Sequence, residues 1–253
     1  LNSALWWQTL WRLLAGLFGA MSFSTAGVLA ASLFKNDPHQ NALAIAVLFG
    51  TGGGLRIVLA GAILPLMLDF YGPSFCPVTW IIVGVLSIAF LPLSLWATLQ
   101  LRATNQVQPK KVVIPIRRIL SELAGYAGFG LGYIVYLTFL SAWMTEQASS
   151  SNFISLIWVL LGSSIYLSPF IWRGILARHS SGRPLAMILS YISIGSAFPV
   201  IFPGDLSLIL SAIIFGLSVF MAPGAITSFI HQNLPPESWG GTISLFTVIF
   251  AIS

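Results

Sequence analysis

Long, continuously apolar runs with almost no charge constrain the fold of this chain more than any other feature. Seven of them cover residues 10–34, 42–70, 78–99, 123–144, 153–172, 185–202 and 206–230, and an eighth begins near Thr242. A spanning helix needs roughly 20 mostly apolar residues. The runs lack the polar alternation of lumen-facing barrel strands. The sequence therefore predicts an all-α, polytopic bundle of transmembrane helices.

Composition and charge exclude several classes of protein. Only 7% of the 253 residues are charged, whereas a soluble domain carries roughly 25%. The 11 basic residues outnumber the 6 acidic ones, but they fall in short loops, so no nucleic-acid partner is expected. One cysteine, and three histidines without acidic neighbours at ligand spacing, predict neither a metal site nor a cofactor. The lipid bilayer is the expected surroundings.

The loop charges predict an orientation. If successive loops alternate between the two sides, one set contains all the basic loop residues: Lys35, Arg102, Lys110, Lys111, Arg117, Arg118, Arg173, Arg178 and Arg183. The opposite loops contain only the acidic Asp69, Glu146 and Asp205. The positive-inside rule then places the basic loops in the cytoplasm and the amino-terminal end outside.

One connection is long and polar. Residues 100–121 contain Pro109 and Pro115 and predict a cytoplasmic linker. We divide the chain accordingly. Residues 1–100 form the end of an amino-terminal helical bundle with three spans, residues 101–121 the linker, and residues 122–253 a carboxy-terminal bundle with four spans and the start of a fifth.

The first two spans have a second copy later in the chain. At one constant offset, without gaps, the identical pairs are Leu13/Leu210, Ala15/Ala212, Phe18/Phe215, Gly19/Gly216, Phe23/Phe220, Gly27/Gly224, Asn36/Asn233, Pro38/Pro235, Leu48/Leu245 and Phe49/Phe246. Parallel repeats of this kind characterise the two halves of major facilitator transporters. If each half has six helices, three helices are expected before Leu1, and part of an eleventh and a twelfth after Ser253.

Two segments resemble a known family. Residues 125–140 (GYAGFGLGYIVYLTFL) resemble its seventh helix, and residues 171–183 (IWRGILARHSSGR) resemble its basic turn between helices eight and nine. The chain is similar, over its whole length, to the YbfB/YjiJ-type branch of the major facilitator superfamily. The resemblance implies a monomeric secondary transporter in a bacterial inner membrane, of which this chain supplies helices four to eleven.

The basic turn departs from the superfamily pattern. Arg178 stands where an acidic residue is common, and one residue is inserted before Gly182. We expect Gly174 and Gly182 to permit tight geometry, while Arg173, Arg178 and Arg183 bond helix-end carbonyls on the cytoplasmic face. The alternative is that these arginines only set the topology.

Two arginines lie within predicted spans. Arg12, followed by Gly16, resembles the superfamily's fourth-helix motif, and its repeat partner is the uncharged Ile209. Arg12 is expected to act in binding or coupling, unless it extends to the nearby membrane surface. Arg56 is near the middle of its span, among several glycines, too deep to reach either surface. It predicts a cavity that binds an anionic substrate, the alternative being a buried structural pair.

Aromatic residues complete the candidate site. Tyr126, Tyr133 and Tyr136 mark two faces of one helix, and some of them are expected to line the central cavity. Trp158 is a further candidate, although core or bilayer packing would also explain it. No carboxylate lies deep in any span. A proton carrier would therefore belong to helices outside this sequence, or coupling uses arginines and tyrosine hydroxyls, or the protein is a uniporter.

The resulting hypothesis is a secondary active transporter that moves a small organic solute by alternating access. The first candidate substrate is an anion, and protons are a candidate coupling ion. A membrane channel or a non-catalytic scaffold is the main alternative, although the sequence shows no ring of charges or filter-like loop. An intramembrane enzyme is disfavoured because His39, His179 and His231 all fall in loops, so no nucleophile–base pair lies within the membrane.

Overall fold

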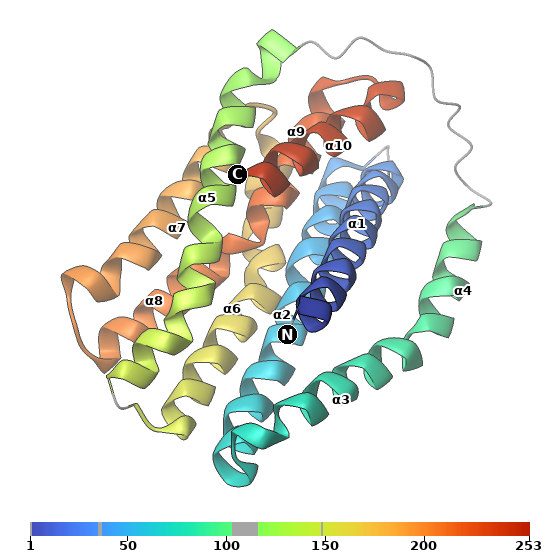
Figure 1. Ribbon diagram of the computed structural model, residues 1–253. Helices are drawn as coiled ribbons and strands as arrows, with labels where there is room; N and C mark the ends of the chain where they lie inside the picture. Colours follow the sequence, from blue (N-terminus) through green and yellow to red (C-terminus); the bar gives the residue numbers. More distant parts are fainter. Residues whose placement is uncertain (1, 35–36, 103–115, 148) are drawn as a thin grey trace.

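The computed structural model describes residues 2–34, 37–102, 116–147 and 149–253, and its secondary structure there is entirely helical (Figure 1). The elements are α1 (Asn2–Ser32), α2 (Pro38–Tyr71), the short 3-10 helix η1 (Pro73–Phe75), α3 (Cys76–Ala89), α4 (Leu91–Arg102), α5 (Ile116–Glu146), α6 (Ser151–Arg178), α7 (Arg183–Ile201), α8 (Asp205–Val219), α9 (Met221–Asn233) and α10 (Pro236–Ile252). We call α1–α4 the amino-terminal group and α5–α10 the carboxy-terminal group.

Seven segments of the described chain are long and apolar enough to cross a membrane, and they match the seven predicted runs. The predicted eighth run corresponds to α10, which has 17 residues. The all-α, membrane-spanning fold is thus confirmed, whereas the sequence repeat stays a prediction. Most of the predicted linker lies outside the described residues. Its last part, from Ile116 onward, is not a loop but the first turns of α5.

Two of the spans are broken by proline. α3 ends and α4 begins around Phe90, just before Pro92, and α8 and α9 meet at Phe220, just before Pro223. Proline lacks an N–H and its ring collides with the carbonyl group four residues earlier, so the helix is interrupted there. Near the second break, the Leu217 carbonyl oxygen accepts a 2.8 Å hydrogen bond from the Trp172 indole.

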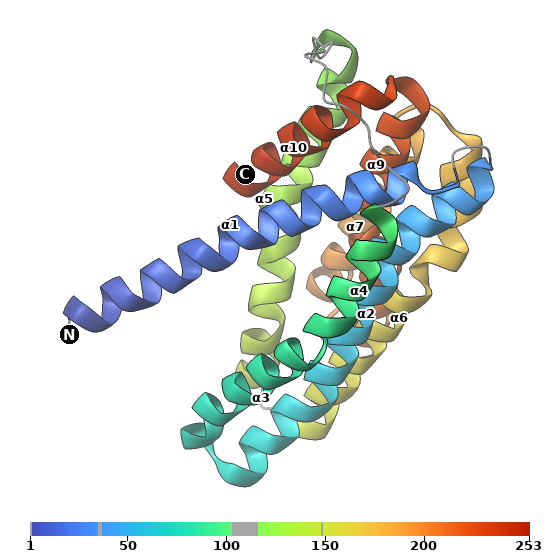
Figure 2. The ribbon, with the colours of Figure 1, turned by 90° about the vertical axis from the view of Figure 1, so that its right-hand side faces the viewer.

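The two groups are joined along α2 and α6, which lie side by side (Figures 1 and 2). A Cβ atom on Gly54 would lie 2.6 Å from the Gly162 carbonyl oxygen and would also collide with the Tyr166 backbone nitrogen. A Cβ atom on Gly162 would lie 2.6 Å from the Val58 backbone nitrogen. Only glycine permits this backbone-to-backbone contact between the helices.

Further contacts between the groups lie near one end of the bundle. There α1 contacts α10, and α2 contacts α9. We call this end the basic side, because the charged residues described there include Arg117, Arg118, Arg178 and Arg183. The opposite end, the acidic side, carries Asp69, Glu146 and Asp205. Figure 2 shows the amino-terminal half of α1 extending away from the other helices.

Candidate functional site

Arg56 lines a cavity of about 300 Å³ between the two groups. α1 and α2 form one wall of the cavity, and the α8–α9 break forms the other. The other lining residues are Phe23, Ala26, Leu48, Phe49, Gly52, Gly53, Phe220 and Pro223. We call this space the Arg56 cavity.

Small residues on α2 let an aromatic ring enter beside the arginine. A Cβ atom on Gly53 would lie 2.5 Å from the Phe220 ring, so any larger residue would displace that ring. The Phe23 and Phe49 rings pack against each other with their centroids 4.9 Å apart. The walls of the Arg56 cavity are therefore apolar and largely aromatic.

The Arg56 side chain is exposed, and its charge has no counter-charge among the described residues. Within the part of the chain that the structure describes, Arg56 makes no hydrogen bond and no salt bridge. It interacts electrostatically with Tyr133 of α5, in the other group. Tyr133 is held by stacking on Phe129 and Phe250, with centroid distances of 4.9 and 5.2 Å. The sequence alternative, a buried ion pair, has no partner among the described residues.

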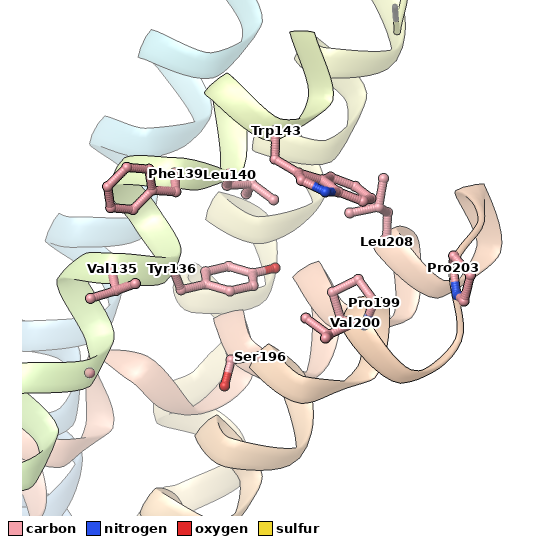
Figure 3. A pocket seen from close by; sticks show the side chains of 11 residues that line it. Val135, Tyr136, Phe139, Leu140, Trp143, Ser196, Pro199, Val200, Pro203 and Leu208 are labelled. Carbon is pink, nitrogen blue, oxygen red and sulfur yellow. The ribbon is translucent and has the colours of Figure 1, made fainter. Parts of the chain in front are cut away.

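None of the three tyrosines of α5 is among the described residues that line the Arg56 cavity. The Tyr136 hydroxyl lies 2.8 Å from the Ser211 hydroxyl, and its ring stacks on Phe215. Tyr136 lines a separate, mostly apolar cavity of about 630 Å³. Figure 3 shows the Tyr136 and Trp143 rings extending across it from α5 toward α7 and α8. Tyr126 is 2% exposed, packs among phenylalanines and lines none of the cavities described here.

Trp158 lines a third cavity, of about 510 Å³, toward the acidic side between α2, α5 and α6. Its indole N–H donates a 2.9 Å hydrogen bond to the Ser141 hydroxyl. Its Cβ atom occupies the place that a side chain on Gly61 would need. Asp69 lines the same cavity. Trp158 thus lies between the groups, but outside the Arg56 cavity.

The structure does not bring the fourth-helix motif into the site. Arg12 is exposed on the part of α1 that extends away from the bundle (Figure 2). A Cβ atom on Gly16 would have no neighbour within 4 Å. Neither residue lines the Arg56 cavity.

The basic turn between α6 and α7 differs from expectation in two respects. A Cβ atom on Gly182 would lie 2.5 Å from a Glu122 carboxylate oxygen, so a larger residue would displace the flexible Glu122 side chain, whereas Gly174 has open space. The exposed Arg178 and Arg183 side chains form no hydrogen bond with described residues.

Side chains of α9 bond this turn instead of the arginines. Gln232 donates to the Leu176 carbonyl oxygen at 2.9 Å, and Asn233 donates to the Ser180 carbonyl oxygen at 2.6 Å. The prediction that the arginines cap these carbonyls is therefore wrong for the described residues. Amide side chains already satisfy the carbonyls, and the arginine side chains stay exposed.

Sequence reasoning missed the aromatic walls of the cavity. One signal was available, because the repeat alignment pairs Phe23 with Phe220. Both residues line the Arg56 cavity, one from each group. The close approach of Glu122 to Gly182 was also missed, since nothing in the local sequence places these two residues together.

A bundle of membrane-spanning helices, with cavities between its two groups, defines an integral membrane protein of the transporter class. Residues 1–253 match the family described as "Uncharacterised MFS-type transporter YbfB", and the chain belongs to this family. The resemblance to a major facilitator transporter is thereby confirmed. No curated protein and no solved structure matches the chain.

Proposed function

We propose that this transporter carries a small organic anion and that Arg56 binds the anionic group. The observation that carries the proposal is the position of Arg56, which faces a cavity between the groups without a counter-charge among the described residues. A charge near the centre of a spanning helix costs roughly 2.5–3.5 kcal/mol on insertion scales. No structural partner among the described residues offsets this cost for Arg56, so a ligand is the best explanation of its presence.

Two further groups favour an anion at this place. α9 begins at Met221, directly after the break, and the amino-terminal end of a helix carries partial positive charge. Broken spanning helices commonly use such ends to hold anionic substrate groups. The Tyr133 hydroxyl, within electrostatic reach of Arg56, supplies a hydrogen-bond donor for the same anion.

The contacts between the groups support alternating access with the basic side closed. Gly27 packs on Ile243, Gly224 packs on Phe49, and the Ser24 hydroxyl donates to the Thr247 hydroxyl at 3.2 Å. Toward the acidic side, the 510 Å³ cavity lies between α2, α5 and α6. We assign the basic side to the cytoplasm of a bacterial inner membrane and expect a monomer. The transport cycle would open the basic side and close the acidic one.

The proposal is tested by uptake into liposomes that contain the purified full-length protein. Panels of organic anions, cations and neutral solutes are offered, with and without an imposed pH gradient that tests proton coupling. Arg56→Ala should abolish anion uptake. Arg56→Lys should retain part of it, because lysine keeps the positive charge but lacks the planar guanidinium group that donates two parallel hydrogen bonds. Arg173→Ala removes an exposed arginine outside the cavities and should transport normally. Anion uptake by correctly inserted Arg56→Ala at the normal rate would contradict the proposal.

A further inference from the structure

We infer that the ligand of the Arg56 cavity is a small monocarboxylate with an apolar, aromatic or branched-chain body. This inference rests on the proposed function and adds the substrate class to it. Three properties of the cavity support it: the number of charges, the chemistry of the walls and the volume.

The charge of the cavity fits a single carboxylate. Arg56 is the only ionisable residue among the described residues that line it. A guanidinium binds a carboxylate with two parallel hydrogen bonds. A second carboxylate or a phosphate ester would place an additional negative charge against apolar walls, where no cation compensates its loss of water.

The walls fit an apolar body. Apart from Arg56, every lining residue is glycine, alanine, leucine, phenylalanine or proline, none of which has a hydrogen-bonding side chain. A sugar or hydroxy acid would lose hydrogen bonds to water there without replacement. An aromatic ring or branched alkyl group instead gains from burial against Phe23, Phe49 and Phe220.

The volume fits a molecule with a single small ring. Ligand pockets in proteins range from roughly 300 to 1,000 Å³, and the Arg56 cavity, at about 300 Å³, is at the lower limit. Phe220 restricts this space, because its ring lies directly over Gly53. Phe220 is therefore the residue that we expect to set the size of the accepted body.

The inference is tested by isothermal titration of the purified full-length protein in detergent. Binding is measured because protonated aromatic acids cross bilayers unaided. The probes are benzoate and 4-methylpentanoate, the dianion terephthalate, the polar monoanion gluconate and the neutral benzamide. At least one of the first two should bind with a Kd about tenfold or more below that of each of the other three, and Arg56→Ala should abolish this binding.

Variants of Phe220 and Phe70 test whether the size of the bound ligand depends on Phe220 in the cavity wall or changes when any phenylalanine is lost. Phe220→Ala should weaken benzoate binding several-fold and improve binding of the larger 2-naphthoate, because the ring over Gly53 is removed. Phe220→Leu is the second variant, should the alanine variant not fold. Phe70→Ala, an exposed residue at the end of α2, should bind like the original protein.

The outcomes distinguish the substrate class from the proposed function. Arg56-dependent binding of gluconate or terephthalate, without binding of either apolar monocarboxylate, would overturn the substrate class and leave the anion transporter standing. Absence of any Arg56-dependent anion binding would overturn both. Equal effects of the Phe220 and Phe70 variants on every probe would remove Phe220 as the residue that sets size.

Discussion

Two tyrosines three residues apart on α5 differ in their partners and should differ in their roles. Tyr133→Phe removes a hydroxyl near Arg56, and hydrogen bonds to charged groups contribute roughly 1.5–3 kcal/mol, so substrate Kd should rise about tenfold or more. Tyr136→Phe removes a hydroxyl that pairs with Ser211, so it should leave Kd unchanged and lower the free energy of unfolding by about 1 kcal/mol. Titration calorimetry and denaturation in detergent measure the two effects. An unchanged Kd for Tyr133→Phe would place Tyr133 outside the binding site.

Single residues show how far sequence reasoning extends. The sequence makes Arg56 a candidate site residue because depth in a span is readable from it, and the role of Arg56 stays a prediction. Its neighbour Phe220 is 164 positions away in the chain, and only the tertiary fold brings its ring onto Gly53. Arg12 is an equally strong candidate by motif, yet it is exposed and does not line the Arg56 cavity, since a motif does not show what surrounds it.

The contact between α2 and α6 determines how the two groups are held, and Gly54 tests it. Gly54→Ala should destabilise the protein by about 1–3 kcal/mol, because the added Cβ meets backbone atoms of α6 that cannot move independently. Gly16→Ala is the matched control, since its Cβ meets nothing within 4 Å and alanine favours a helix by roughly 0.5–1 kcal/mol. Melting temperatures in detergent should fall for the first variant and hold or rise for the second. Equal melting temperatures would show that the two helices separate easily at Gly54.

Helix positions could be predicted from hydropathy, but the two helix breaks could not. Pro92 and Pro223 lie next to breaks, whereas Pro65 and Pro169 lie inside continuous helices. A proline alone therefore does not decide whether a helix breaks. Near the α8–α9 break, the Trp172 indole N–H bonds the Leu217 carbonyl oxygen, a contact between residues 45 positions apart that no local pattern reveals.

The repeat, which stays a prediction, has a consequence for the contacts between the two groups. The alignment pairs α1 with the α8–α9 span, and α2 with α10. Exchanging the copies therefore turns the α1–α10 contact into the α9–α2 contact, and the structure contains both. With a two-fold relation of this kind, the α1–α10 and α2–α9 contacts together would close the substrate path on the basic side.

A crosslink between α1 and α10 tests whether that closed end must open. Cys76 is the only cysteine in the sequence, so Cys76→Ser gives a cysteine-free background. Ser24→Cys and Thr247→Cys introduced there replace two hydroxyls that lie 3.2 Å apart, close enough for oxidation or a short bifunctional maleimide to join them. The oxidised crosslink should stop uptake into liposomes, reductant should restore it, and the Arg56 cavity should still bind ligand from the acidic side. Each single-cysteine variant controls for the substitutions themselves.

Uptake that continues after complete crosslinking would mean that α1 and α10 stay together throughout transport. The opening on the basic side would then have to lie between α2 and α9.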